Sequence, residues 1–236
     1  MTNAYHPTPR SRVKRSPTRA IYDHEKVHAI LDSAMLCHVA YAIDGQPYCT
    51  PTIHWREGGQ VYWHGSSASR MLRQQAKGMP VCLTVTHFDG LVLARSAYNH
   101  SCNYRSAMVF GTARLVDEPE EKRRALDAIT ERLVPGRAAT LRPMSTQEIK
   151  ATSVVVMEIE EASAKIRAEN VGDDAEDGDW PVWAGVIPLV TRTGAPEPSP
   201  MLSAGIALPE TLAPYRAGRR LDEVMAETYA AYAGKE

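Results

Sequence analysis

The stretch LCHVAYAIDGQPYCTPTIHW, residues 36–55, predicts a β-hairpin. Two runs rich in β-branched and aromatic residues, 36–43 and 48–55, flank the dipeptide Asp44-Gly45. This dipeptide readily adopts the positive φ angles that a type I′ hairpin turn needs. The pattern therefore favours antiparallel strands joined by tight turns.

Other segments on both sides of this hairpin fit the same architecture. Asp23 can cap a helix with an apolar stripe from Val27 to Met35, and Pro119 follows Asp117 at the start of a second helix to about Val134. Asp89-Gly90 suggests another hairpin turn, and Gly111 suggests a bulge or a close backbone approach. Strands are expected at residues 60–64, 81–88, 91–97, 104–116, 152–159 and 165–168. Antiparallel strands with helices set between them favour an α+β barrel over a doubly wound sheet.

The composition excludes several classes of protein. The 236 residues include 27 Lys and Arg and 28 Asp and Glu, so a strongly basic nucleic-acid-binding protein is not expected. No apolar run approaches the roughly 20 residues that cross a bilayer, and the N-terminal residues lack the apolar core of a secretory signal. The four cysteines are widely spaced and read as reduced thiols. We therefore expect a cytoplasmic protein that binds neither nucleic acid nor a membrane.

Three parts of the chain differ in composition. Residues 1–20 form a basic arm, which either is solvated or folds back to meet an anion. Residues 21–195 hold the predicted barrel domain. Residues 196–236 begin with the Pro-rich linker PEPSP and continue into a helical tail, whose stripe from Leu221 to Tyr232 predicts packing against the barrel or a second subunit.

The common catalytic signatures are absent, and the eight histidines do not follow metal-ligand spacing, so no metal site is predicted. Polar residues instead gather near the strands. In YWHGSSASR, residues 62–70, a strand ends in a histidine and leads through small hydroxyl residues into a helix. Hydroxyls, backbone N–H groups and an arginine suit a phosphate dianion, although Ser-rich helix caps are also common without one.

Two further segments carry polar or aromatic groups suited to a ligand. Residues 90–106 contain two Arg-Ser pairs with Asn and His between them, which could contact phosphate and ring edges or form structural ion pairs. Residues 180–186 hold two tryptophans, which could wall a flat ring or pack in a core.

These segments resemble the FMN-binding split-barrel, pyridoxamine 5′-phosphate oxidase-like superfamily, and within it the nitroimidazole-reductase-like flavoproteins. The resemblance is carried by GLVLARSAYNHSCNYRSAMVFG (90–111), YWHGSSASRML (62–72), PGR (135–137), EEASAKIR (160–167) and PVWAGVIPL (181–189). It implies a six-stranded antiparallel split β-barrel, α+β in class, that forms a homodimer with FMN at the subunit interface. The Arg-x-His motif of the pyridoxamine phosphate oxidases is missing after Trp183, which disfavours oxidation of that vitamer.

The resemblance also implies the cofactor site. Expected flavin-binding residues are Thr50, Pro51, Thr52, His64, Gly65, Ser66, Ser69, Arg70, Arg95, Ser96, Asn103, Tyr104, Arg105, Ser106 and Trp183. Arg70 and Arg105 are the candidates for the phosphate, and Arg95 or Arg105 for the positive group near the edge of the flavin ring. His64 is the candidate catalytic residue that faces the substrate.

The predicted function is that of an FMN-dependent oxidoreductase, which reduces small electron-poor substrates of the nitro-aromatic type with reduced nicotinamide. The alternative is a non-catalytic protein that stores or senses flavin, haem or a deazaflavin. Possible axial ligands for haem are His38, His54, His64, His87 and His100.

Overall fold

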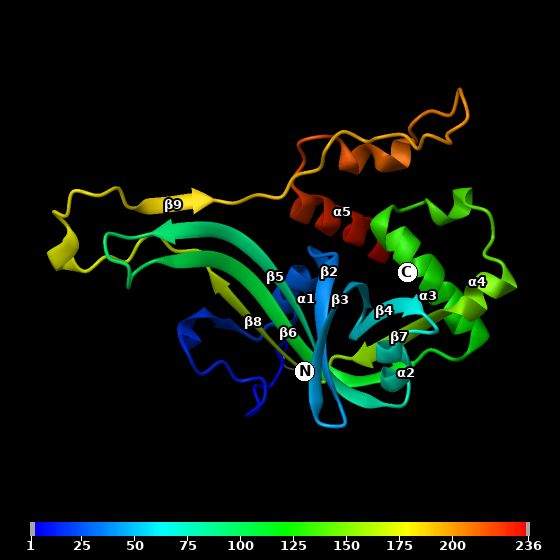
Figure 1. Cartoon of the computed structure of the whole chain (residues 1–236), viewed down its shortest axis with the longest axis horizontal. Helices are drawn as coiled ribbons and strands as arrows, with labels where there is room; N and C mark the ends of the chain where they lie inside the picture. Colours follow the sequence, from blue (N-terminus) through cyan, green and yellow to red (C-terminus); the bar gives the residue numbers. More distant parts are fainter. Residues whose placement is uncertain (1–2, 235–236) are drawn as a thin grey trace.

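A ring of six antiparallel strands forms the centre of the computed structural model, which describes residues 3–234 (Figure 1). The sheet order is β1-β8-β6-β7-β4-β3-β2-β5-β9, and an additional pairing between β5 and β6 closes the ring. The ring strands are β2 (Leu36–Ile43), β3 (Gln46–Glu57), β4 (Gln60–Ser66), β5 (Met79–Leu93), β6 (Ser101–Leu115) and β7 (Thr152–Glu158). Outside the ring lie β1 (Ala20–Ile21), β8 (Glu161–Arg167) and β9 (Gly185–Pro188). The predicted α+β class with a six-stranded split barrel is confirmed.

The β2–β3 hairpin forms as its sequence predicts. Asp44 and Gly45 have φ angles of 52° and 78°, and Ile43 pairs with Gln46 across the turn. Tyr41 stacks on Tyr48 with ring centroids 5.4 Å apart, a cross-strand pair that helps hold the register. The Asp44-Gly45 turn and the Tyr41–Tyr48 pair therefore specify the same register of the two strands.

The predicted hairpin turn at Asp89-Gly90 is wrong. β5 runs through it as one long strand, and the register against β6 shifts between Phe88 and Gly90. A Cβ atom at Gly90 would lie 3.0 Å from the carbonyl oxygen of Ile187, so the glycine instead makes room for β9. The ladder between β5 and β6 continues past this point, and their hairpin extends away from the barrel together with β9 (Figure 1).

Two apolar cores lie on opposite faces of the barrel wall. Trp63 and Leu83 belong to the core inside the ring, whereas Trp55 and Tyr62 belong to a second core with α3. Gly111 is the close approach that the sequence predicts, because a Cβ atom there would lie 2.1 Å from the carbonyl oxygen of Glu158. The end of β7 therefore leaves no space for a side chain at this position.

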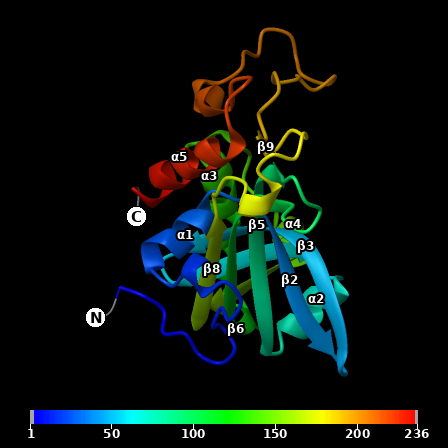
Figure 2. The same ribbon diagram turned by 90° about the vertical axis from the view of Figure 1, so that its left-hand side faces the viewer.

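The helices lie outside the ring and start at polar caps. Asp23 caps α1, Ser69 caps α2, and Ser145 with Glu148 forms a capping box at α4. The α-helices are α1 (His24–Asp32), α2 (Arg70–Gln75), α3 (Pro119–Leu133), α4 (Thr146–Ala151) and α5 (Leu221–Ala233), and 3₁₀ turns occur at Pro17–Arg19, Ala138–Thr140, Ala175–Asp177 and Glu210–Tyr215. The tail helix α5 packs against α1 and α3 of its own chain (Figures 1 and 2). No helix in residues 3–234 is long and apolar enough to cross a membrane.

The described part of the basic N-terminal arm folds back on the barrel. Arg10 forms an ion pair with Glu161 at 2.6 Å, and Arg19 forms one with Glu169, also at 2.6 Å. The arm lies beside α1 and β8 in Figure 2. The anions that it meets in this chain are therefore carboxylates at the two ends of β8.

Candidate functional site

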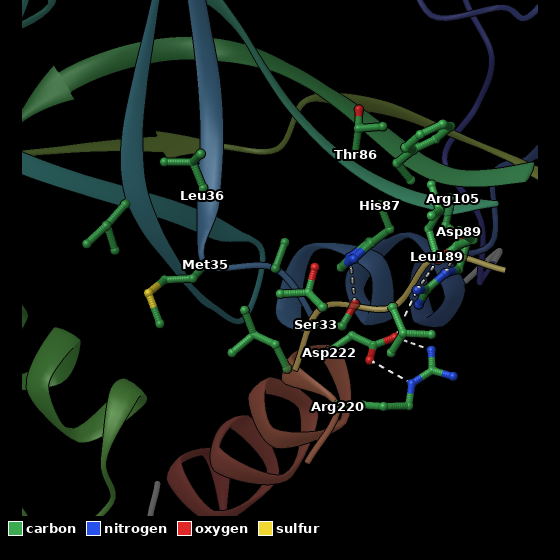
Figure 3. Close-up of a pocket in the computed structure, with 16 residues that line it drawn as sticks. Ser33, Met35, Leu36, Thr86, His87, Asp89, Arg105, Leu189, Arg220 and Asp222 are labelled. Carbon is green, nitrogen blue, oxygen red and sulfur yellow. Dashed lines mark hydrogen bonds and ion pairs between the residues drawn. The ribbon is translucent and has the colours of Figure 1, made fainter. Parts of the chain in front are cut away.

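A cavity of about 790 Å³ lies where the edge of β5 has no strand beside it. β5 pairs with β2 through Cys82–Thr84 and with β9 from Gly90 onward, and neither strand pairs with residues 85–89 between them. The end of α1, the start of β2 and the chain after β9 surround this gap (Figure 3). Its walls include the apolar side chains of Met35, Leu36, Ile53, Phe88, Leu189, Val190 and Leu221.

His87 is the histidine of this cavity. Its Nε2 atom lies 3.1 Å from the Ser33 hydroxyl (Figure 3) and 3.4 Å from the Ile30 carbonyl oxygen. A carbonyl oxygen can only accept a hydrogen bond, so Nε2 carries the proton and Nδ1 keeps a lone pair. Burial first, and then the charge of Arg105, lowers the pKa of His87. The cavity therefore contains a neutral imidazole at pH 7.

Charged side chains form one side of the same cavity. Arg105 donates to Asp89 at 2.7 and 2.9 Å and to Asp222 at 2.8 Å, and Arg220 also donates to Asp222 at 3.0 Å. Burial alone would raise the pKa of Asp222, but the hydrogen bonds from Arg220 and Arg105 hold it well below its usual value. Asp222 is thus an anion that ties the first turn of α5 to the β5–β6 hairpin.

The predicted phosphate-binding segment lies at another place, where β4 leads into α2. The Ser69 hydroxyl accepts from the backbone N–H of Leu72, and the Arg70 guanidinium lies 4.9 Å from the centre of the Tyr48 ring. Among the described residues no carboxylate forms an ion pair with Arg70. The side chain of Arg70 is exposed, so it is accessible to an external anion.

Thr50 lies close to this segment through the β2–β3 hairpin. Its hydroxyl is 3.2 Å from the Tyr41 hydroxyl, and Tyr41 stacks on the Tyr48 ring that Arg70 covers. Pro51 and Thr52 follow on β3, where Pro51 pairs with His38 on the exposed face of the sheet. The chain therefore brings part of the predicted flavin site together around Tyr48.

His64, the predicted catalytic residue, is half-buried near the end of β4. Its ring lies 6.1 Å from the Trp55 ring, and its Nδ1 atom is buried with no hydrogen-bond partner in residues 3–234. Burial lowers its pKa, so the imidazole is neutral at pH 7. Gly65 and Ser66 continue the strand beside β7.

The other predicted flavin residues lie on the long hairpin, and several already have partners. Arg95 forms an ion pair with Asp173 at 2.6 Å, and the Asn103 side chain accepts from Arg167 at 2.6 Å. Ser96, Tyr104 and Ser106 lie along the same hairpin, and Trp183 is 63% exposed just before β9. No hydrogen bond, ion pair or ring contact between described residues joins this group to Arg70, so their common role at a flavin stays a prediction.

Sequence reasoning did not predict the cavity. Ser33, His87 and Asp222 come from α1's end, β5 and α5, and no local pattern places them together. Only His87, which is one of the possible axial ligands for haem, pointed to this place in the sequence. No group of three or more His, Cys, Asp or Glu residues suited to a metal ion occurs in residues 3–234.

Comparison with solved structures finds two relatives that match most of the chain. A flavocytochrome, Anf3, from Azotobacter vinelandii is 44% identical with a TM-score of 0.85, and the match covers 91% of this chain and 100% of that one. An FAD- and haem-binding protein from Mycobacterium smegmatis is 36% identical with a TM-score of 0.81, covering 86% of this chain and 98% of that one. A search of curated proteins found no match.

A more distant similarity also appears. A structure described as a putative 5-nitroimidazole antibiotic resistance protein, from Bacteroides thetaiotaomicron, is 25% identical with a TM-score of 0.49, and the match covers 62% of this chain and 86% of that one. The family model described as pyridoxamine 5′-phosphate oxidase matches residues 23–166, which include the whole six-stranded ring. The chain therefore belongs to the pyridoxamine 5′-phosphate oxidase family.

Proposed function

We propose that this chain is a redox protein that binds a flavin and a haem. The observation that carries the proposal is the cavity at the open edge of β5, which offers one neutral imidazole between apolar side chains and a group of paired charged side chains. Two relatives that match most of the chain, a flavocytochrome and an FAD- and haem-binding protein, support the same pair of ligands.

The residues of the cavity fit a haem. A volume of about 790 Å³ is in the usual range for a cofactor pocket, and the apolar side chains suit a flat macrocycle. His87 supplies a neutral ring nitrogen, the form of histidine that binds iron. The other sequence candidates fit less well, because His54 is buried in the wall and His100 is exposed on the hairpin loop.

The flavin has a separate candidate site around Arg70. This guanidinium has no carboxylate partner among the described residues, and the hydroxyls of Ser66 and Ser69 lie on the adjoining segment. An unpaired guanidinium beside hydroxyl groups suits a phosphate. We keep FMN as the expected flavin, and the FAD of the Mycobacterium smegmatis relative is the alternative.

We propose a homodimer as the form that completes the flavin site. The outer face of β2, β5 and β6 exposes large apolar side chains, with Leu36 at 55%, Phe88 at 51% and Met108 at 42%. An apolar sheet face of this kind favours association with another protein surface. A second copy would bring its own long hairpin, with Arg95, Asn103 and Trp183, to the first copy's Arg70.

The activity that we propose is reduction of a small electron-poor substrate by reduced nicotinamide. The flavin supplies hydride and single-electron transfer when it is bound, and the haem supplies single-electron transfer. The chain's own groups bind and orient: Arg70 holds the phosphate, His87 holds the iron, and His64 faces the substrate as a neutral hydrogen-bonding group. A protein that only stores or senses the two ligands is the alternative.

Absorbance spectra of the purified full chain, followed by titration with haemin and with FMN or FAD, test the ligands. We expect a Soret band and a flavin band from the wild type. His87→Ala should lose the Soret band and keep the flavin, whereas the exposed control His100→Ala should keep both. Arg70→Ala should weaken flavin binding by about 10- to 100-fold, the cost of one charge-assisted hydrogen bond, with haem unchanged.

Chromatography of the released flavin separates FMN from FAD, and light scattering gives the oligomeric state. Oxidation of NADH with and without a nitro-aromatic acceptor separates a reductase from a storage protein. A wild type that binds neither haem nor flavin, or a His87→Ala variant with an unchanged Soret band, contradicts the proposed sites.

A further inference from the structure

His87 is held by the C-terminal end of α1. Its Nε2–H donates to the Ser33 hydroxyl at 3.1 Å and lies 3.4 Å from the Ile30 carbonyl oxygen. The Ser33 hydroxyl in turn donates to the same Ile30 carbonyl oxygen at 3.1 Å, so it has only lone pairs to offer to His87. Two acceptors therefore meet one imidazole N–H.

These acceptors carry more negative charge than isolated groups would. Ile30 belongs to the last turn of α1, whose terminal carbonyls have no partner further along the helix. The helix dipole adds partial negative charge at this end. Ser33 is only 9% exposed, so little water screens the contact.

We propose that Ser33 is a positioning residue, which together with the Ile30 carbonyl orients the His87 ring and makes it a stronger electron donor to the haem iron. The inference rests on the proposed haem site and adds to it the group that sets the reduction potential. Histidines that bind metals commonly donate their second N–H to such an acceptor, which fixes the tautomer and raises the basicity of the ligating nitrogen. A more basic ligand favours ferric over ferrous iron and lowers the potential.

The same arrangement explains why His87 is placed on β5 where no strand covers the edge. Between Thr84 and Asp89 no strand pairs with β5 on this side, which lets the end of α1 approach the ring directly. Asp32, the residue before Ser33, is fixed by hydrogen bonds from the buried Arg56 at 2.6 and 3.0 Å. Ser33 is thus held by a rigid neighbour and does not need the ligand for its own position.

The experiment compares the wild type with Ser33→Ala and Ser33→Thr in the full chain. Three quantities are measured: haem affinity by absorbance titration with haemin, the midpoint potential by spectroelectrochemistry, and the His87 tautomer by ¹⁵N NMR of the haem-free protein. Ser145→Ala is the matched control, because Ser145 also caps a helix but lines no part of the cavity.

Ser33→Ala should bind haem about tenfold more weakly, the lower end of the range for an outer-shell partner. Its midpoint potential should rise by up to 59 mV, which corresponds to a tenfold change in the ferric-to-ferrous preference. In the haem-free Ser33→Ala protein, only the longer 3.4 Å contact to the Ile30 carbonyl oxygen still favours the proton on Nε2, so the tautomer with the proton on Nδ1 should gain population. Ser33→Thr keeps the hydroxyl and should restore all three values, and Ser145→Ala should change none.

The two levels of the proposal fail differently. If His87→Ala abolishes haem binding but Ser33→Ala leaves the potential and the tautomer unchanged, the positioning role of Ser33 is overturned and the haem site stands. If His87→Ala binds haem as the wild type does, the proposed ligand is overturned and the role of Ser33 with it.

Discussion

The Asp32–Arg56 ion pair is buried, and its removal gives a quantitative test of the structure. The Arg56 guanidinium donates to the two carboxylate oxygens of Asp32 at 2.6 and 3.0 Å, and each side chain is only 8% exposed. Arg56 also contacts the Tyr229 ring at 4.8 Å, and Arg132 donates to the Asp32 backbone carbonyl. The pair therefore joins α1, β3, α3 and α5.

Asp32→Ala leaves the charge of Arg56 buried beside Arg132 with no carboxylate to compensate. Breaking a buried pair on one side costs about 3–5 kcal/mol of the free energy of unfolding. With a urea dependence of about 3 kcal/mol per molar, the unfolding midpoint should fall by about 1–1.7 M. All variants are compared in the same ligand state, since bound cofactors add stability of their own.

The matched control is Glu120→Ala, which removes the exposed partner of Arg123 at 4.0 Å and should cost less than about 1 kcal/mol. The double variant Asp32→Leu with Arg56→Met replaces the pair by apolar side chains and should recover much of the loss. A cost for Asp32→Ala that is as small as that of Glu120→Ala would refute the reasoning, because it would mean that water reaches Arg56.

Three further predictions concern global stability and local protection from hydrogen exchange. His54 is buried, which lowers its pKa to about 4, so the unfolded chain takes up a proton at this residue before the folded chain does as the pH falls below 6.5. The free energy of unfolding should therefore decrease by on the order of 3 kcal/mol from pH 6.5 to pH 4. Urea unfolding of His54→Gln should show a flatter dependence on pH. Gly111→Ala should lower the thermal midpoint strongly, with a cost of about 3 kcal/mol or more, because its Cβ atom meets backbone at 2.1 Å; Gly172→Ala, with open space around it, should not. Asp222→Asn should weaken the link between α5 and Arg105. Hydrogen exchange should then become faster in α5 and near Arg105, while the barrel strands stay protected. Equal protection in the wild type and the variant would show that the ion pair does not hold this end of α5.

Several elements could be predicted from the sequence because their signals are local. Asp44-Gly45 needs positive φ angles and forms a tight turn wherever two strands flank it. Ser145 and Glu148 satisfy each other's backbone N–H groups within one helical turn. The split-barrel family was also recognisable, since the residues 90–111 form a long and specific motif. Such features depend on neighbours a few positions apart.

Where distant segments compete with a local signal, the residues nearby in the sequence do not determine the outcome. Asp89-Gly90 has the composition of a turn, but the long ladder with β6 and the approach of β9 keep β5 extended through it. Arg105 has the chemistry of a phosphate ligand, yet Asp89 and Asp222 occupy its guanidinium in this chain. Neither the extended course of β5 nor the ion pairs of Arg105 can be predicted from the neighbouring residues in the sequence.

The sequence by itself determined the barrel, the main helices and the chemical character of the segment before α2. Only the tertiary structure decided that β5 has an open edge, and that Ser33, His87 and Asp222 meet there. The physical reason is that periodicity and turn chemistry act over a few residues. The cavity is instead made by the packing of distant segments: His87 is 54 positions from Ser33 and 135 positions from Asp222. Its position depends on where pairing between strands stops, and pairing is a property of the whole sheet.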